Sequence, residues 1–373
     1  MRIGCPTEIK AQEGRVGVTP AMTYAFEKAG HEVFIQAGAG VKSGFPDEAY
    51  VQAGAKILAT AKEVFDASDM IIKVKEPLPA EYDLFHEGQI LFTYLHLAPD
   101  REQTEGLLKA KVIGIAYETV QLANGSLPLL SCMSEIAGRM AVQVGAHLLE
   151  APCGGGGILL GGVSGVKRGH VVILGGGVVG TSAVKIAVGM GARVTVLDMS
   201  APRLLYLSDI FGSRIQTLMS NPFNIAEAVK DADVLISSVL VPGGRTPKLV
   251  TDEMVHSMKP GSVLIDVAVD QGGAIPFIDR ITTHADPYFI KDGYVCYSVA
   301  NMPGAVPHTS TLALTNVTLP YALKIANMGA EAALKADPAL KAGLNVYKGY
   351  ITYEGVREAY PELPFKSADE VLG

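Results

Sequence analysis

The sequence predicts an α/β protein with two doubly wound domains, the first of which is discontinuous in sequence. Short apolar strands alternate with helical stretches in both halves of the chain, and this alternation builds a parallel sheet covered on both faces. A helical tail from about residue 306 follows the second set of strands, so we expect it to return to the first domain. We therefore predict a first domain over residues 1–128 and 307–373 and a second over 129–306.

The composition is typical of a soluble enzyme. The formal net charge is −7 and no basic cluster is found, which disfavours nucleic-acid binding. The four cysteines are far apart and form no C-x-x-C pair, which indicates reduced thiols and predicts no metal site. The chain enters a strand pattern without a signal-peptide segment, and no apolar run is long enough to span a bilayer. We expect a cytoplasmic protein with no membrane partner.

Six strands are expected in the first domain, over residues 2–7, 32–36, 56–58, 70–74, 89–95 and 112–117. One helix between them is predicted to begin at Pro20 with Thr19 as its N-cap, because proline fits the first helical position. A longer amphipathic helix is expected over 131–152 from its apolar spacing. It ends at the glycine run 154–157, which we interpret as a flexible joint.

The second domain is expected to contain six more strands, over residues 171–175, 194–198, 215–219, 234–239, 263–269 and 294–299. This number matches a complete doubly wound nucleotide-binding domain of the Rossmann type.

The first turn of that domain carries the most informative motif of the chain. Gly175, Gly177 and Gly180 form G-x-G-x-x-G between a buried strand and a helix. The first glycine permits a tight turn, the second lets backbone approach a pyrophosphate, and the third lets the helix pack close to the strand. The next strand ends at Asp198, whose carboxylate can accept hydrogen bonds from a ribose. The alternative is an ordinary tight turn, but strand, helix and acid all lie where a dinucleotide needs them.

The acid also bears on the choice of dinucleotide. A carboxylate at position 198 would repel a 2′-phosphate, so the sequence favours NAD over NADP. Arg203, five residues further on, weakens this preference a little.

Three residues of the first domain follow predicted strands directly: Arg15, Lys75 and His96. Ligands of open α/β sheets bind at the carboxyl ends of the strands, so the three would point toward one crevice. An arginine and a lysine together indicate a small anionic substrate, and histidine is the natural acid–base group near neutral pH. Each also has a simpler explanation, as a solvated surface cation or a buried structural histidine.

Two residues of the second domain occupy comparable positions. Asp270 ends the apolar run SVLIDVAVD, and Asn301 follows the last predicted strand. Both would lie near a nicotinamide ring bound at this sheet edge. Asp270 is equally consistent with a turn or capping aspartate, and Asp266 in the same run is interpreted as structural.

At these residues the chain resembles the NAD-dependent L-alanine dehydrogenases over essentially its whole length. The opening IGCPTEIKAQEGRVGVTP, the segment TYLHLAPD with its histidine, and GGGVVGTSAVKIAVGMGARVTVLD are similar to signatures of that family. DVAVDQGG and NMPGAVPHTSTLALTN are similar to its C-terminal motifs. Ser164 stands where the family pattern GGVPGV has proline, a departure that concerns a turn rather than the chemistry.

The resemblance implies reversible oxidative deamination of L-alanine with NAD, giving pyruvate, ammonia and NADH, in a homohexamer. It implies that Arg15 and Lys75 bind the substrate and that His96 and Asp270 form the acid–base pair. Together with the glycine motif, the positions that match cofactor contacts are Ser134, Gly175, Gly177, Val178, Val179, Gly180, Asp198, Arg203, Ser220, Val239, Leu240, Val267, Ala268, Val269, Asp270, Arg280, Ser298, Val299, Ala300 and Asn301.

Three other functions remain open at this point. A lysine-forming saccharopine dehydrogenase has the same general plan but takes a much larger substrate. The NAD-binding subunit of a proton-translocating transhydrogenase moves hydride between two nucleotides in a membrane complex. It would not need the pair His96 and Asp270. A non-catalytic NAD-binding module is disfavoured, because a sensor needs no acid–base pair.

Overall fold

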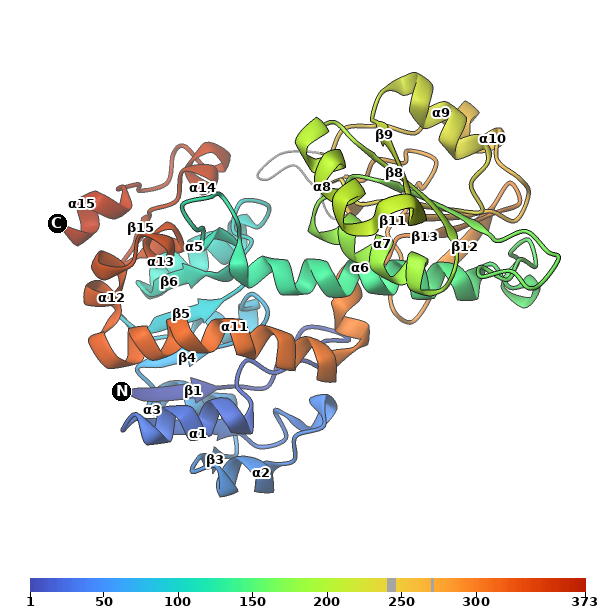
Figure 1. Cartoon of the computed structure of the whole chain (residues 1–373). Coiled ribbons are helices and arrows are strands. Elements are labelled where there is room, and N and C mark those ends of the chain that lie inside the picture. The colour runs from blue at the N-terminus through green and yellow to red at the C-terminus, as the bar shows by residue number, and fades with distance from the viewer. Residues whose placement is uncertain (240–245, 270–271) are drawn as a thin grey trace. The chain divides into compact units, whose positions relative to one another are not determined.

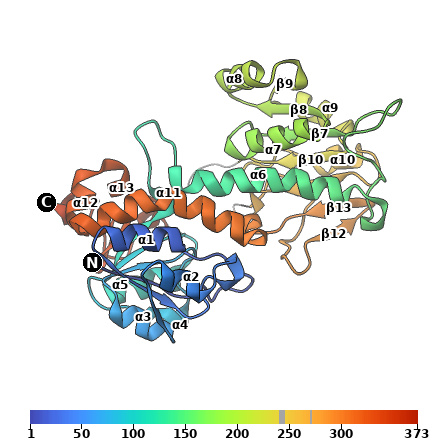
Figure 2. The same cartoon turned by 60° about the horizontal axis from the view of Figure 1, so that its bottom comes forward.

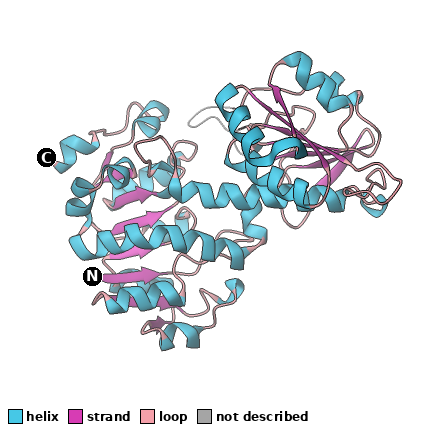
Figure 3. Cartoon of the chain, in the orientation of Figure 1, coloured by secondary structure: helices cyan, strands magenta, loops and turns pink. Residues whose placement is uncertain are grey.

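The computed structural model describes residues 1–239, 246–269 and 272–373. The chain divides into two compact units: unit 1 comprises Met1–Met133 and Gly304–Gly373, and unit 2 comprises Ser134–Pro303. Each unit is a sheet with helices on both of its faces (Figure 3). The predicted fold class, with a first domain built from both ends of the chain, is therefore confirmed.

Unit 1 contains an eight-stranded sheet with the order β15-β14-β6-β5-β4-β1-β2-β3. Strands β1 to β6 are parallel, and the predicted strands are all present but end earlier where the chain leaves the sheet to form loops. Their bounds are β1 (Arg2–Cys5), β2 (Glu32–Gln36), β3 (Lys56–Leu58), β4 (Met70–Ile72), β5 (Ile90–Thr93) and β6 (Ile113–Ala116).

The tail of the chain differs from the prediction because it is not helical throughout. After α11 (Pro307–Met328), α12 (Ala330–Ala336) and α13 (Pro338–Ala342), it forms a hairpin of β14 (Leu344–Tyr347) and β15 (Tyr350–Ile351). The two-residue turn Lys348-Gly349 has φ values of 45° and 95°, as a tight hairpin requires. Strand β14 adds antiparallel to β6, so the sheet is mixed. The chain then ends with α14 (Glu354–Ala359) and α15 (Ala368–Leu372).

Helices cover both faces of this sheet, with α1 and α11 on one face and α3 and α5 on the other (Figures 1 and 2). Helix α1 begins as predicted, with the side chain of Thr19 accepting a hydrogen bond from the amide of Met22. The remaining elements of the first segment are α1 (Pro20–Lys28), η1 (Val41–Ser43), α2 (Asp47–Gln52), α3 (Ala61–Ala67), α4 (Pro79–Tyr82), α5 (Arg101–Ala110) and η2 (Tyr117–Thr119).

Unit 2 contains a seven-stranded sheet with the order β12-β13-β11-β10-β7-β8-β9. All neighbours are parallel except β12, an edge strand that the sequence analysis did not identify and that runs antiparallel to β13. The bounds are β7 (His170–Leu174), β8 (Arg193–Asp198), β9 (Gln216–Met219), β10 (Val234–Ser237), β11 (Val263–Asp266), β12 (Tyr288–Lys291) and β13 (Tyr294–Tyr297). Strand order reverses between β7 and β10, the point at which doubly wound sheets bind nucleotides.

Alternate residues of these strands pack on opposite faces of the sheet. Val172 and Leu174 of β7 face a core that contains Val229 of α9 and Val255 of α10. On the other face, Gly138 in α6 lies so close to Val179 in α7 that a side chain there would overlap its carbonyl. The helices are α6 (Pro128–Leu148), η3 (Ala151–Cys153), α7 (Val178–Gly189), α8 (Ala201–Phe211), η4 (Gly212–Arg214), α9 (Pro222–Lys230), α10 (Asp252–His256) and η6 (Met302–Ala305).

The interpretation of the glycine run 154–157 as a flexible joint is wrong. The amide of Gly156 donates to the carbonyl of Gly261 at 3.0 Å, and that of Gly157 donates to Leu149 at 2.8 Å. The run is therefore fixed within unit 2, and the chain instead leaves unit 1 at Met133, inside α6. In the residues that the structure describes, no helix is both long and apolar enough to cross a bilayer.

Candidate active site

Arg15, Lys75 and His96 follow three strands that are neighbours in the sheet of unit 1. Strands β1, β4 and β5 lie side by side and run parallel, so the residues after them meet at one edge. The charge of Arg15 acts on Lys75, and Arg15 also interacts with Tyr94. The ring of Tyr94 stacks on His96 with centroids 5.8 Å apart. The three sequence-predicted residues thus belong to one group of interacting side chains.

The guanidinium of Arg15 is held in place by Glu13. Its Nε donates to one carboxylate oxygen at 2.7 Å and its Nη2 to the other at 2.6 Å. Nη1 lies 3.2 Å from the sulfur of Met133, and the side chain of Arg15 is only 2% exposed. Burial alone lowers the pKa of Arg15, but Glu13 more than offsets it, so the pKa lies above its ordinary value. The guanidinium is therefore charged and fixed in orientation.

Lys75 is also largely buried, with its Nζ 3.9 Å from Glu76. Burial is the largest effect on its pKa, which lies below the ordinary value of 10.5. The positive charges of Arg15 and Lys10 lower the pKa further, and Glu76 opposes them. Concentrated positive charge of this kind favours an anionic ligand.

His96 stands on a backbone conformation that is unusual for its residue type. Its φ is 48°, in the left-handed region, and its side chain is 44% exposed. Its Nδ1 lies 3.6 Å from Oε1 of Glu118, while the ring of Tyr94 lies parallel to it within 1°. The imidazole is therefore oriented from two sides and still accessible to a ligand.

Three carboxylates that the sequence analysis did not single out hold the backbone of this group. Glu13, Glu8 and Glu118 accept the N–H groups of Arg15, Lys75 and His96, respectively. Each acid lies a few residues beyond the end of a strand, as the three site residues do. That position was a usable signal, but the search considered cations and histidine there, because acids are usually on the surface.

Glu8 also anchors a buried charge cluster beneath this edge. Lys73 is fully buried, and its Nζ donates to Glu8 at 3.1 Å and to Glu81 at 2.8 Å. Burial lowers the pKa of Lys73, but the two carboxylates more than offset this and raise it above its ordinary value. The amide of Val74 donates to Glu8 at 2.6 Å, so the cluster fixes the strand end that carries Lys75.

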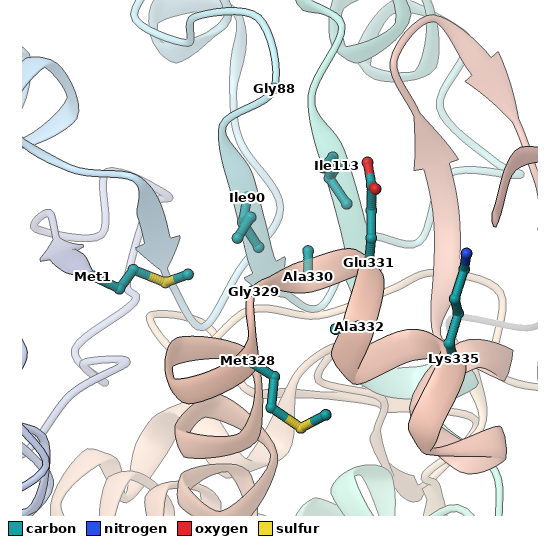
Figure 4. Close-up of a pocket in the computed structure, with 10 residues that line it drawn as sticks. All are labelled: Met1, Gly88, Ile90, Ile113, Met328, Gly329, Ala330, Glu331, Ala332 and Lys335. Atoms are coloured by element: carbon teal, nitrogen blue, oxygen red, sulfur yellow. The ribbon is translucent and has the colours of Figure 1, made fainter.

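A pocket of about 580 Å³ lies at the opposite edge of the sheet of unit 1. Figure 4 shows Ile90 and Ile113 at the beginnings of β5 and β6, facing Met328 and the helix that carries Glu331 and Lys335. The carboxylate of Glu331 there accepts hydrogen bonds from Tyr347 and Lys348. This pocket holds none of the sequence-predicted site residues.

The predicted cofactor residues of unit 2 gather at the carboxyl ends of its parallel strands. The glycine turn follows β7, Asp198 ends β8, and the other positions follow β9, β10, β11 and β13 in turn. These other positions are Ser220, Val239, Val267, Ala268, Val269, Ser298, Val299, Ala300 and Asn301. Ser134 lies apart from the strand ends, on α6. Arg280 lies in a loop, with its carbonyl accepting from Ser298 Oγ at 2.7 Å. Leu240 and Asp270 lie outside the described residues.

The glycine turn explains why each of its glycines is required. A side chain at Gly180 would place Cβ 1.8 Å from the carbonyl oxygen of Gly175, so the helix can approach the strand only with glycine there. Gly175 has a φ of 95°, which side chains rarely adopt. At Gly177, the N-cap of α7, an added Cβ would meet no protein atom within 4 Å. Val178 and Val179 then form the first turn of α7.

Asp198 and Arg203 are both tied to this turn. Asp198 Oδ2 accepts from the amide of Gly176 at 2.7 Å, and Oδ1 accepts from Ser200 at 2.8 Å. Arg203 donates through Nε to the carbonyl of Gly176 at 2.5 Å and through Nη2 to Thr181 at 2.6 Å. The acid and the arginine therefore lie beside the turn, with Arg203 engaged by protein atoms.

Asp266 agrees with its interpretation as a structural residue. Its carboxylate accepts hydrogen bonds from the amides of Ala268, Ala274 and Ile275, and burial raises its pKa. Over residues 1–239, 246–269 and 272–373, no group of three or more His, Cys, Asp or Glu side chains is arranged to hold a metal ion.

Comparisons with known proteins extend over the whole chain. The family model described as "Alanine dehydrogenase/PNT, N-terminal domain" matches residues 4–137, and "Alanine dehydrogenase/PNT, C-terminal domain" matches 141–354. The alanine dehydrogenase of Methanococcus maripaludis is 62% identical over 372 residues, which cover 100% of both chains. The chain belongs to the alanine dehydrogenase family. The resemblance stated from the sequence motifs is thereby confirmed, and the chain is an oxidoreductase of this family.

Further members of the alanine dehydrogenase family agree with this. The alanine dehydrogenase of Lysinibacillus sphaericus is 58% identical over 100% of both chains. A solved L-alanine dehydrogenase has a TM-score of 0.94 and 54% identity, covering 97% of this chain and 99% of its own. A transhydrogenase from Sinorhizobium meliloti has a TM-score of 0.80 but only 24% identity, over 95% of this chain and 99% of its own, so it shares the fold alone.

Proposed function

We propose that this chain catalyses the reversible oxidative deamination of L-alanine with NAD, giving pyruvate, ammonia and NADH. The observation that carries the proposal is the 62% identity, over the full length of both chains, to an alanine dehydrogenase. The chemistry of unit 1 supports it, because a buried guanidinium, a lysine and an accessible histidine meet at one sheet edge. The saccharopine dehydrogenase and transhydrogenase alternatives are not favoured.

In this proposal the carboxylate of alanine binds to Arg15 and Lys75. The guanidinium is already oriented by Glu13, so little side-chain entropy is lost when the substrate binds. Lys75 adds a second positive charge, and with pyruvate it polarises the carbonyl oxygen.

His96 and Asp270 supply the proton transfers. Bound NAD would accept the hydride that leaves Cα, and the substrate becomes an iminium ion. One of the two residues removes a proton from a water molecule as its oxygen bonds to the iminium carbon, giving a carbinolamine. That carbinolamine loses its hydroxyl proton and releases the amine as ammonia, leaving pyruvate. Each step needs a group that can take and return a proton near the working pH.

The chemistry of unit 2 fits NAD. The open space over Gly177 leaves room for a pyrophosphate, and the N-terminus of α7 presents backbone N–H groups with a partial positive charge. Asp198 would bind a ribose hydroxyl, and its charge disfavours the 2′-phosphate of NADP. Ser134, Ser220, Arg280, Leu240 and the residues after β11 and β13 complete the proposed contacts. We further propose a cytoplasmic homohexamer, as the resemblance implies, whose stoichiometry native mass spectrometry measures.

The proposal is tested by the cosubstrate requirement. The purified protein should oxidise NADH only when pyruvate and ammonium are both present, and ¹⁵N from labelled ammonium should appear in L-alanine. Turnover with 2-oxoglutarate and lysine instead would identify a saccharopine dehydrogenase. Hydride exchange between NADPH and an NAD analogue without pyruvate would identify a transhydrogenase. Binding of NADH without any turnover would leave a non-catalytic module.

Replacing Gly177 with alanine should weaken NADH binding without destabilising the protein. The new methyl group meets no protein atom within 4 Å, so it can clash only with the nucleotide. We expect the dissociation constant to rise by about tenfold or more, which corresponds to about 1.4 kcal/mol. Fluorescence titration with NADH measures it.

The matched control is Gly189→Ala, in the same helix and with equal space around it. It should leave NADH binding unchanged. Equal affinities for the two variants would show that the pyrophosphate does not lie over Gly177.

Binding of the substrate carboxylate should weaken as Lys75 loses its proton. The pKa of Lys75 lies below 10.5, so the charged form that binds the carboxylate is lost at a lower pH than for an ordinary lysine. Affinity should be highest below this pKa and should fall as pH rises through it. Titration of the NADH complex with oxamate, an unreactive pyruvate analogue, from about pH 7 to about pH 10 measures this without ammonia ionisation.

In Lys75→Arg the fall should disappear, because a guanidinium keeps its proton over this range. A fall of the same size in this variant would assign the pH dependence to another group.

A further inference from the structure

The backbone at His96 needs support that the sheet does not provide. The β5–β6 ladder ends at the pair Thr93 and Ala116, and beyond it β6 gives way to the short helix η2. The amides of Leu95 and His96 therefore have no strand to bond. In addition, φ at His96 is 48°, a conformation that costs free energy for any residue other than glycine and persists only when its surroundings enforce it.

Glu118, in η2, supplies the missing acceptors. Its two carboxylate oxygens each accept from the amide of Leu95 at 3.2 Å, and Oε1 accepts from the amide of His96 at 2.6 Å. From the other side, Gln103 donates to the carbonyl of Leu95 at 2.8 Å. The carboxylate is mostly buried, with 14% of the side chain exposed, so these are charge-assisted hydrogen bonds shielded from water.

The same carboxylate oxygen also orients the imidazole ring. Oε1 of Glu118 lies 3.6 Å from Nδ1 of His96. The ring of Tyr94 lies parallel to the imidazole and is itself fixed by a 2.6 Å hydrogen bond from its hydroxyl to the carbonyl of Leu129. With Nδ1 directed at the carboxylate, the other nitrogen, Nε2, is at the far side of the ring.

We propose that Glu118 is a positioning residue for His96: it holds the left-handed turn and directs Nε2 of the imidazole toward the substrate. The inference rests on the proposed role of His96 in proton transfer. Glu118 acts only through His96 and touches neither the substrate nor the cofactor. Glu8 and Glu13 accept backbone amides in the same way, but only Glu118 also faces a titratable ring.

Two substitutions separate the parts of this role. Glu118→Gln keeps an oxygen for the amides but removes the charge that faces Nδ1, whereas Glu118→Ala removes both. We expect kcat with pyruvate and ammonium to fall about 10- to 100-fold in Glu118→Ala and less in Glu118→Gln, since displacement of a reacting group by about 1 Å has effects of this size. The KM for NADH should be unchanged. Glu105→Gln, which alters an exposed carboxylate paired with Arg101, is the matched control and should keep full activity.

A double variant tests whether Glu118 acts through His96. In a His96→Asn background, adding Glu118→Ala should change kcat less than about twofold, because the group that it positions is already gone. A second full loss of 10- to 100-fold would overturn the proposal and give Glu118 a separate role. An unchanged kcat in both single variants, with unfolding midpoints equal to that of the parent protein, would overturn it as well.

Crystal structures of the two single variants test the placement without any assay. In Glu118→Ala, residue 96 should leave the left-handed region, and in Glu118→Gln the ring should turn away from its position beside residue 118. An unmoved backbone and ring in both would contradict the proposal even if the enzyme is active. If the parent protein does not turn over pyruvate and ammonium, the proposed function fails, and the crystallographic result still shows whether Glu118 positions His96.

Discussion

Replacing His96 with asparagine is expected to lower kcat by roughly 100- to 10,000-fold, the usual contribution of a positioned acid–base group. Asparagine is the best choice because residue 96 has a φ of 48°, and asparagine tolerates the left-handed region better than alanine does. The variant therefore removes the imidazole with little change to the turn. Steady-state rates at saturating pyruvate, ammonium and NADH measure the effect.

Binding of NADH should be unaffected by this substitution, because the glycine turn proposed to bind it belongs to unit 2. Fluorescence titration provides the control. A variant with unchanged kcat would show that His96 takes no part in the chemistry. A variant that loses NADH affinity and rate together would indicate a disturbed fold rather than a missing proton donor.

Replacing Gly180 with alanine is expected to disturb unit 2 more than any other single methyl group proposed here. The new Cβ would lie 1.8 Å from the carbonyl oxygen of Gly175 and 2.9 Å from Oγ of Ser238. Since the nearest atom is backbone, either the turn after β7 or helix α7 has to move. We expect a loss of stability of about 3 kcal/mol, at the upper end for overpacked interiors, together with loss of NADH binding.

Thermal unfolding with and without NADH measures both effects. Gly189→Ala, near the other end of α7, meets no atom within 4 Å and should instead stabilise the helix by about 0.5–1 kcal/mol. A Gly180→Ala protein with the unfolding midpoint and the NADH affinity of the parent would mean that α7 does not approach the turn as closely as described.

The parts of the fold that could be predicted from sequence are those that local patterns encode. The glycine turn and the parallel strands of both units follow from runs of adjacent residues, and the N-cap at Thr19 follows from the Thr-Pro pair. The hairpin of β14 and β15 was missed because its strands are short and follow three helices. Its turn at Lys348-Gly349 was the available signal.

The candidate site divides in the same way. The position of Arg15, Lys75 and His96 after strands could be inferred from the alternation of elements, although their roles stay proposals. The contacts that hold them could not, because Glu118 and His96 are 22 positions apart and meet only when β5 and β6 pair. The left-handed backbone at His96 has no local signature either, since histidine does not predict it.

The discontinuity of unit 1 has a consequence for synthesis of the chain. Unit 2 is one continuous segment, Ser134–Pro303, so all of its strands have left the ribosome before α11 is made. The first six strands of unit 1 are made earlier still, yet β6 remains an open edge until β14 arrives close to the end of translation. Exposed edges invite pairing with other chains. The earliest part of the protein to emerge is thus among the last to be completed, and a nascent chain that stops before residue 344 carries an unprotected edge.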